Sequence, residues 1–201
     1  MDSDFNIHTI YDGQFKVTYR GIPVWKCPFD YVIYQMIICE VKPDLIIEIG
    51  TNFGGSSLYM ADLLSIVNPS GCIHTIDVVK KFGLEITNNP RISTFVDGWQ
   101  NYDITQVKKF SKVMVIDDGA HHYQHVLGAW KKFHSLVSVD SYYIIEDGII
   151  NDLGLQGYDG GPLRAIKEIF PLDGWMIDRR FCDLFGKNAT FNTDGYLKRT
   201  R

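Results

Sequence analysis

Four carboxylate residues follow two apolar segments of the chain and are the clearest candidates for a reactive cluster. Asp117 and Asp118 end one of these segments, and Glu146 and Asp147 end the other. Like charges close together raise each other's pKa, and a hard cation such as Mg²⁺, which prefers oxygen ligands, removes the repulsion. Neighbouring residues of a strand point to opposite faces, so both members of a pair converge only if the strand end bends. The pattern favours a magnesium site, with helix-capping and solvated aspartates as the alternative.

Two histidines come directly after the first carboxylate pair. His121 and His122 follow Asp118 within four residues. An imidazole with its ordinary pKa of about 6.5 accepts a proton near neutral pH, so either residue is a candidate general base. A capping or simply exposed histidine explains the sequence equally well.

A glycine-rich loop, EIGTNFGGS at 48–56, follows a third apolar segment. Its glycines allow the backbone to come close to a ligand at a helix N-terminus. A carboxylate beside the loop would repel a pyrophosphate but attract a cofactor that carries a sulfonium and an ammonium. The loop therefore favours S-adenosylmethionine, with a plain tight turn as the alternative. The expected cofactor contacts are Glu48, Gly50, Thr51, Asn52, Phe53, Gly54, Gly55 and Ser56.

Two further segments end in residues that suit an adenosine cofactor. Asp77 closes the run CIHTID, where an acidic side chain accepts hydrogen bonds from ribose hydroxyls. Asp97 and Gly98 follow the run RISTFV and are expected to line an adenine pocket, although an ordinary turn is equally consistent with them.

Alternating element types predict how these residues are positioned. Helical spacing predicts helices over 28–42, 56–67, 104–110, 126–136 and 163–170. Short β-branched or aromatic runs predict strands over 44–50, 72–77, 91–96, 112–117, 141–147, 175–178 and 189–191. This order predicts an α/β fold with an open, mainly parallel sheet covered by helices on both faces. Ligands of such sheets bind at the carboxyl ends of the strands, where the candidate residues lie.

Composition limits the possible partners. The 201 residues suit one domain, expected at 28–201 after a lead-in segment at 1–27. A net charge of −4 argues against nucleic acid binding, and the chain has no apolar run of about 18 residues that would span a membrane. Four irregularly spaced cysteines and a polar N-terminus predict reduced thiols and a cytoplasmic location. We expect a small-molecule partner.

Five segments of the chain resemble the cephalosporin hydroxylase family, in the same order as in that family. They are RGIPVWKCPFDYVIYQMIICEVKPDLIIEIGTNFGGSSLYMADLL, VIDDGAHHYQHVL, SYYIIEDG, GPLRAIKEIF and TFNTDGYLKR, and together they cover about residues 20–199. Despite its name, this family looks like class I S-adenosylmethionine-dependent methyltransferases. The resemblance implies a three-layer Rossmann-like methyltransferase fold, whose mainly parallel seven-stranded sheet carries an antiparallel C-terminal strand.

The resemblance also implies specific site residues. The methyl donor would bind at the glycine-rich loop and Asp77, and Asp118, Glu146 and Asp147 would hold Mg²⁺ with Asp117 as their neighbour. Homo-oligomers are usual in such a family. The sequence does not support the hydroxylase label itself. A non-haem iron site commonly contains a local HxD or HxE motif, and none of the six histidines has an acidic residue two positions later.

The leading hypothesis is an S-adenosylmethionine-dependent, Mg²⁺-assisted O-methyltransferase that acts on a hydroxylated small molecule, such as a sugar or secondary metabolite. The metal would lower the pKa of the attacking hydroxyl, and His121 or His122 would take its proton. One alternative is a non-catalytic cofactor-binding subunit that supports a partner enzyme. The other is an NAD-dependent oxidoreductase, which the loop spacing and Glu48 disfavour.

Overall fold

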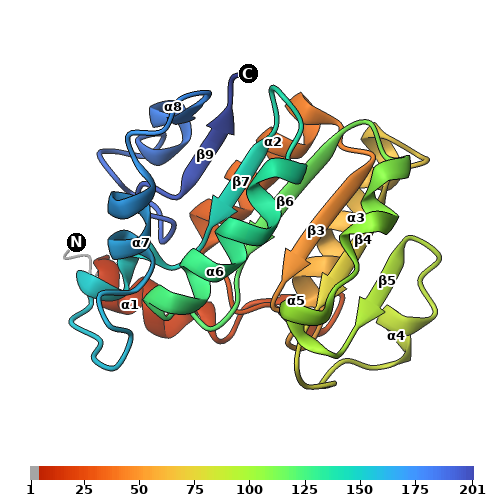
Figure 1. The fold of residues 1–201 in the computed structure, drawn as a ribbon. Coiled ribbons are helices and arrows are strands. Elements are labelled where there is room, and N and C mark those ends of the chain that lie inside the picture. Colours follow the sequence, from red (N-terminus) through yellow and green to blue (C-terminus); the bar gives the residue numbers. More distant parts are fainter. Residues whose placement is uncertain (1–4) are drawn as a thin grey trace.

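A seven-stranded sheet runs through the computed structural model, which describes residues 5–201, in the strand order β5-β4-β3-β6-β7-β9-β8 (Figure 1). Five neighbouring strands are parallel: β3 (Leu45–Ile49), β4 (Cys72–Ile76), β5 (Ile92–Phe95), β6 (Val113–Asp117) and β7 (Tyr142–Ile145). The strand β9 (Tyr196–Arg199) pairs antiparallel with both β7 and β8 (Trp175–Ile177). The predicted mainly parallel seven-stranded sheet with an antiparallel C-terminal strand is therefore confirmed.

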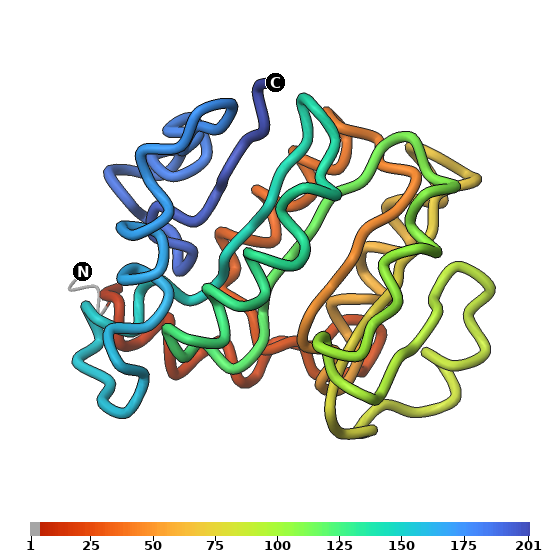
Figure 2. Tube along the Cα trace, viewed as in Figure 1, coloured from red at the N-terminus to blue at the C-terminus, as the bar shows by residue number. Residues whose placement is uncertain are grey.

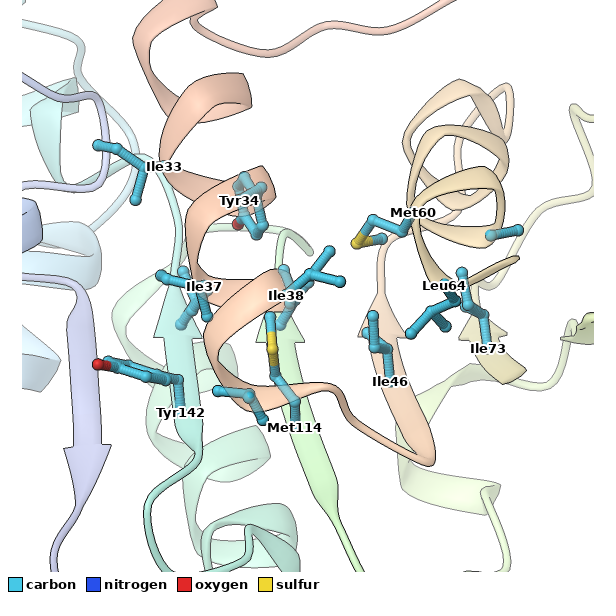
Figure 3. Close-up of a cluster of buried hydrophobic side chains, with 14 of the residues drawn as sticks. Ile33, Tyr34, Ile37, Ile38, Ile46, Met60, Leu64, Ile73, Met114 and Tyr142 are labelled. Carbon is cyan, nitrogen blue, oxygen red and sulfur yellow. The ribbon is translucent and has the colours of Figure 1, made fainter. Parts of the chain in front are cut away.

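Helices cover both faces of the sheet, so its central strands are apolar throughout. The helices α2 (Pro28–Val41) and α3 (Gly55–Val67) pack on one face, and α6 (Tyr123–Phe133) and α7 (Gly161–Ile169) pack on the other. Figure 3 shows Ile38 of α2 and Leu64 of α3 close to Ile46 on the first face. The flanking residues Leu45 and Ile47 belong to the opposite core cluster, as the alternation of a strand requires.

Local signals account for the helix boundaries. Pro28 occupies the first turn of α2, where its missing N–H removes no hydrogen bond, and Lys42 ends the helix in a left-handed conformation with φ 49°. The predicted helices are confirmed within a few residues, although the one expected at 104–110 is the 3₁₀ helix η1. The shorter elements are α4 (Leu84–Thr87), α5 (Gly98–Asn101), η1 (Ile104–Lys109), η2 (His134–Leu136), η3 (Gly148–Asn151) and α8 (Arg179–Cys182).

The strand predicted at 189–191 is wrong. These residues form a loop that is fastened to a buried carboxylate, because the Thr190 hydroxyl and the Phe191 N–H both donate to Asp30. The last strand is β9, further along the chain. Side-chain hydrogen bonds to Asp30 therefore take the place of a strand ladder at this position.

The N-terminal part of the chain folds over the carboxyl ends of the parallel strands. It contains α1 (Ile7–Gln14) and a small hairpin of β1 (Thr18–Tyr19) and β2 (Ile22–Pro23). Figure 2 shows this red segment passing along the lower edge of the sheet before α2 begins. We call residues 7–26 the N-terminal arm. Within residues 5–201, no helix has both the length and the apolar character that crossing a membrane requires.

Candidate functional site

A cavity of about 500 Å³ opens at the carboxyl ends of the parallel strands. The turns after five successive strands contribute to its wall, and the N-terminal arm covers it. The strand-end residues in this wall are Gly50, Asn52, Asp77, Val78, Gly98, Trp99, Asp118, Gly119, Ala120, His121 and Asp147. The structure thus brings together predicted residues from the glycine-rich loop, the ribose position and the acidic cluster.

The loop after β3 is shaped by residues with positive φ. Gly50 has φ 100°, and a Cβ at this position would lie 1.9 Å from the backbone oxygen of Asp118. Asn52, with φ 46°, donates its N–H to Asp77 Oδ2 over 2.8 Å. Within the described part of the chain, Asn52 Oδ1 is buried and has no hydrogen-bond partner. This turn exposes backbone to the cavity and leaves one acceptor for a ligand.

Glu48 is buried among hydroxyl side chains. Its carboxylate is 1% exposed and accepts hydrogen bonds from the hydroxyls of Ser56, Ser57 and Thr75. Burial raises its pKa, although these hydroxyls oppose the shift. Through Ser56 and Ser57, Glu48 binds the first turn of α3, next to the glycine-rich loop. Its expected contact with the cofactor stays a prediction.

The remaining loop residues lie beside a small recess between the loop and the N-terminal arm. A Cβ at Gly55 would come within 2.4 Å of the backbone oxygen of Pro23, so the glycine allows the arm to pack here. Thr51 Oγ1 lies 2.7 Å from Thr75 Oγ1 in the layer below. The predicted loop residues around this recess are Thr51, Phe53, Gly54, Gly55 and Ser56.

The ends of β4 and β5 form one wall of the cavity. Asp77 Oδ1 accepts hydrogen bonds from the N–H groups of Val78 and Val79, over 2.7 and 3.1 Å. Gly98, with φ 76°, and Trp99 continue this wall after β5. Asp97 is exposed and is not part of the cavity lining, and its backbone oxygen accepts from Asn101.

A buried lysine binds two of the predicted carboxylates. Lys26 Nζ lies 3.1 Å from Asp118 Oδ2 and also contacts both oxygens of Glu146. Tyr34 donates its hydroxyl to Glu146 Oε1 over 2.6 Å. Burial alone would lower the pKa of Lys26, but the two carboxylates raise it, whereas burial raises the pKa of both acids. The ion pairs of Lys26 with Asp118 and Glu146 anchor the N-terminal arm to the ends of β6 and β7.

The other oxygen of Asp118 faces His121 and Asp147. His121 Nε2 lies 3.3 Å from Asp147 Oδ2 and 3.7 Å from Asp118 Oδ1. One ligand atom from each of the three residues lies within 4.8 Å of the other two, and all three side chains are half-buried. Two carboxylates beside an imidazole are a donor set that fits a divalent cation. Glu146 faces Lys26, and His121 is the third side chain beside Asp118 and Asp147. The expected role of Glu146 as a metal ligand stays a prediction.

The remaining residues predicted in this region lie around that trio. Asp117 is buried behind it, and burial raises its pKa to about 7. Its Oδ2 has no hydrogen-bond partner among residues 5–201. His122 is exposed at the N-terminus of α6, with its ring 5.2 Å from that of Tyr158. Of the two candidate bases, the structure therefore brings His121 to the acidic cluster.

Several residues of the site were missed by sequence analysis. Most lie on the N-terminal arm, which was interpreted as a lead-in without elements. No local pattern marks a single lysine or glutamine as buried, since both residue types are usually exposed. The missed residues of the cavity and its ion pairs include Tyr11, Gln14, Phe15, Trp25, Lys26, Trp99, His125 and Tyr158.

Comparison with known sequences gives one consistent result. The family model described as Rhamnosyl O-methyltransferase/CmcI matches residues 12–200. A rhamnosyl O-methyltransferase of Mycobacterium bovis is 31% identical over 175 residues, which cover 79% of this chain and 69% of the relative. The protein of the same name from Mycobacterium leprae is 29% identical over 206 residues, covering 96% and 88%.

Comparison with solved structures supports the fold. A CmcI structure with Mg and SAM superposes with a TM-score of 0.68 at 22% identity, covering 93% of this chain and 78% of that one. The apo structure of CmcI gives a TM-score of 0.70 at 21% identity, covering 93% and 77%. An O-methyltransferase from Bacillus cereus in complex with SAH gives 0.54 at 17% identity, covering 74% and 72%. At these identities the likeness concerns the arrangement of strands and helices.

Proposed function

The chain belongs to the rhamnosyl O-methyltransferase/CmcI family and is an S-adenosylmethionine (SAM)-dependent O-methyltransferase, and from this premise we propose that it methylates a sugar hydroxyl with the help of Mg²⁺. The name of its relatives favours a sugar over other secondary metabolites. The observation that carries the proposal is that Asp77 and the trio of Asp118, His121 and Asp147 line the same cavity. The family removes the nicotinamide-dependent alternative.

The donor half of the site lies at the ends of β3, β4 and β5. Bound SAM supplies a methyl group that is already activated on a positively charged sulfur. Asp77 Oδ1 already accepts from two backbone N–H groups, whereas Oδ2 accepts from one and keeps a further lone pair that can accept from a ribose hydroxyl. Asn52 Oδ1 offers a second acceptor, and Gly50 and Gly98 leave room for the ligand beside the backbone.

The acceptor half lies at the ends of β6 and β7. We assign Asp118 and Asp147 as the metal ligands, because Mg²⁺ in enzymes is commonly bound through one or two carboxylates, with water or substrate completing its shell. A bound Mg²⁺ supplies Lewis acidity, which lowers the pKa of a coordinated hydroxyl. Glu146, expected as a third ligand, holds Lys26 and thereby positions Asp118 through that lysine.

His121 is assigned as the group that takes the hydroxyl proton. Burial lowers its pKa, but Asp147 and Asp118 raise it by more, so the net shift is upward. The assignment rests on position, because His121 Nε2 lies 3.3 Å from Asp147 Oδ2 and 3.7 Å from Asp118 Oδ1, beside the proposed metal ligands. His122 is exposed and is not assigned this role.

The test uses Asp147→Asn, because Asp147 has φ 57°, a conformation that asparagine tolerates, and because the Lys26 pair is left intact. Purified protein is incubated with SAM and a panel of methyl pyranosides, with Mg²⁺ or with EDTA, and methylated product is measured by mass spectrometry. We expect Mg²⁺-dependent product from the wild type and a fall of about 100-fold or more in the variant, with SAH affinity retained.

The control is Asp97→Asn, which changes an exposed carboxylate outside the cavity and should act like the wild type. Mn²⁺ binding, followed by electron paramagnetic resonance, should weaken about 10-fold or more in Asp147→Asn alone. Full Mg²⁺-dependent turnover by Asp147→Asn would contradict the metal assignment. SAH binding by the wild type without turnover of any acceptor would point instead to a non-catalytic cofactor-binding subunit.

A further inference from the structure

The N-terminal arm brings a buried polar side chain to the cavity. Gln14, the last residue of α1, is 4% exposed and lines the cavity. Among residues 5–201, its side-chain amide makes no hydrogen bond, and the amide atoms are not sealed in the core but open on the cavity. A polar amide that faces a cavity without a protein partner is available to a ligand or to water. Gln14 therefore marks a place where a polar group of a ligand is expected.

Two aromatic rings of the arm stand beside this amide in the cavity wall. Phe15 and Trp25 each remain 44% exposed, although both line the cavity. Their ring centroids lie 5.5 Å apart at an interplanar angle of 81°, and Trp25 packs edge-to-face on Phe53 at 5.2 Å. Edge-to-face packing fixes the rings but leaves ring faces uncovered, so the arm presents rigid apolar surface to the ligand.

The arm holds these groups next to the acidic cluster. Trp25 directly precedes Lys26, whose Nζ lies 3.1 Å from Asp118 Oδ2. In Figure 1, α1 and α5 lie towards opposite ends of the lower edge of the sheet. The helix α1 packs against the cluster that contains Ile149, two residues after Asp147, so Gln14 at its end lies towards the acidic cluster. Trp25 also reaches Phe53 of the glycine-rich loop and so lies between the two halves of the cavity.

This combination matches the surface of a sugar ring. A pyranose carries hydroxyl groups around its edge and apolar C–H groups on its faces. An amide beside the carboxylates can bind the hydroxyls at the edge of the sugar ring, and an aromatic side chain can cover one of its faces. A few polar groups in an apolar wall give a pocket specificity in this way. A purely apolar ligand would leave Gln14 unpaired.

We propose that Gln14, Phe15 and Trp25 form the subsite for the ring that carries the reacting hydroxyl, and that this ring is a pyranose of a glycoside. The inference rests on the proposed function and deepens it. Gln14 binds a hydroxyl next to the one that is methylated, and the two aromatic rings contact the C–H face. Gln14 and Phe15 position the acceptor, and Trp25 bounds the subsite on the side of the glycine-rich loop, where the methyl donor is proposed to bind.

The test compares Gln14→Ala and Trp25→Ala with two matched controls. Gln124→Ala removes an exposed amide of α6, and Phe185→Ala removes a ring that is 47% exposed outside the cavity. Saturation-transfer NMR records binding of methyl pyranosides to each protein loaded with SAH. Steady-state kinetics give KM and kcat for the acceptor, calorimetry gives the Kd for SAH, and circular dichroism confirms folding.

In the wild type and both controls, the pyranose C–H protons should receive saturation. In Gln14→Ala and Trp25→Ala, the acceptor KM should rise about tenfold, with kcat and the Kd for SAH within about twofold of the wild type. Unchanged KM and NMR signals in these variants would overturn the inference, and so would an equal loss of SAH affinity. Stronger binding of a simple phenol than of any pyranoside would overturn the assignment to a sugar.

Failure of the proposed function gives a different result. In that case the wild-type protein binds pyranosides in the NMR experiment but forms no methylated product. The Trp25→Ala variant no longer binds them. The subsite then stands without the reaction.

Discussion

Lys26 offsets the electrostatic repulsion between the carboxylates of Asp118 and Glu146. Asp118 and Glu146 follow neighbouring strands, and a buried Glu146 beside a half-buried Asp118 would be unfavourable for two anions. The ammonium of Lys26 lies between them and leaves only one side of Asp118 directed to His121 and Asp147. The protein thus neutralises one side of this acidic cluster with its own lysine, and the proposed Mg²⁺ would neutralise the other side.

Replacing this lysine should be costly for stability. In Lys26→Met the carboxylates of Asp118 and Glu146 lose their counter-ion. We expect the free energy of unfolding at pH 8 to be about 3–5 kcal/mol lower than in the wild type. The loss should shrink as the pH falls below 6, because burial raises the pKa of both acids and their neutral forms need no partner. Denaturant unfolding at several pH values measures it.

The matched control is Lys16→Met, which removes an exposed lysine of the same arm. Its stability should stay within about 0.5 kcal/mol of the wild type. If Lys26→Met unfolds like this control at pH 8, the ion pair does not anchor the arm.

Single residues of the site were predictable only where a strand pattern carried them. Asp118 and Asp147 follow buried strands and were predicted as metal ligands, and the structure places them together with His121. Lys26 and Gln14 could not be found in this way, because Lys26 contacts residues 92 and 120 positions away and neither side chain differs in type from a surface residue.

At the scale of elements, the turn between β3 and α3 is the part of the site most restricted by backbone geometry. Gly50 has φ 100°, and its missing side chain leaves space for the backbone of Asp118. The same turn places Asn52 against Asp77. One residue therefore determines how closely the turns after β3 and β6 approach each other.

Gly50→Ala should disrupt this turn. The added Cβ would lie 1.9 Å from the backbone oxygen of Asp118. The left-handed φ costs an L-residue a further amount of about 1–2 kcal/mol. We expect at least about 3 kcal/mol of lost stability, together with loss of SAH binding in calorimetry.

Gly157→Ala is a matched control, because Gly157 has φ 96° and nothing lies within 4 Å of its added Cβ. It should lose only about 1–2 kcal/mol from backbone strain. Equal losses in the two variants would mean that the close approach to Asp118 is unimportant.

Elements were predictable where hydrophobic periodicity decided them. The apolar residues of β3 and β6 are consecutive and do not recur at helical spacing, so the sequence predicted both strands. The segment 189–191 has similar residue types, but the carboxylate of Asp30 binds its backbone and side chain, and this contact spans about 160 residues. Local pattern carries no information about such a distant partner.

At the scale of the whole molecule, the seven-stranded order follows from alternating strands and helices together with the family resemblance. The antiparallel position of β9 between β7 and β8 brings the C-terminal strand beside the end that carries Glu146. The cavity depends on this assembly, since its wall comes from five strand ends and an arm far apart in sequence. A homo-oligomer remains a prediction.

A ligand that fills such a shared cavity stabilises every element that contributes to it. Since a ligand that binds only the folded chain adds RT ln(1 + [L]/Kd), SAH at about 100 times its Kd should add about 2.7 kcal/mol. For a chain of this length that corresponds to a rise in Tm of about 5–11 °C, measured by differential scanning calorimetry. NADH at the same concentration should leave Tm unchanged, because we propose that the loop after β3 binds SAM. A rise with NADH and none with SAH would contradict the placement of the cofactor at this edge of the sheet.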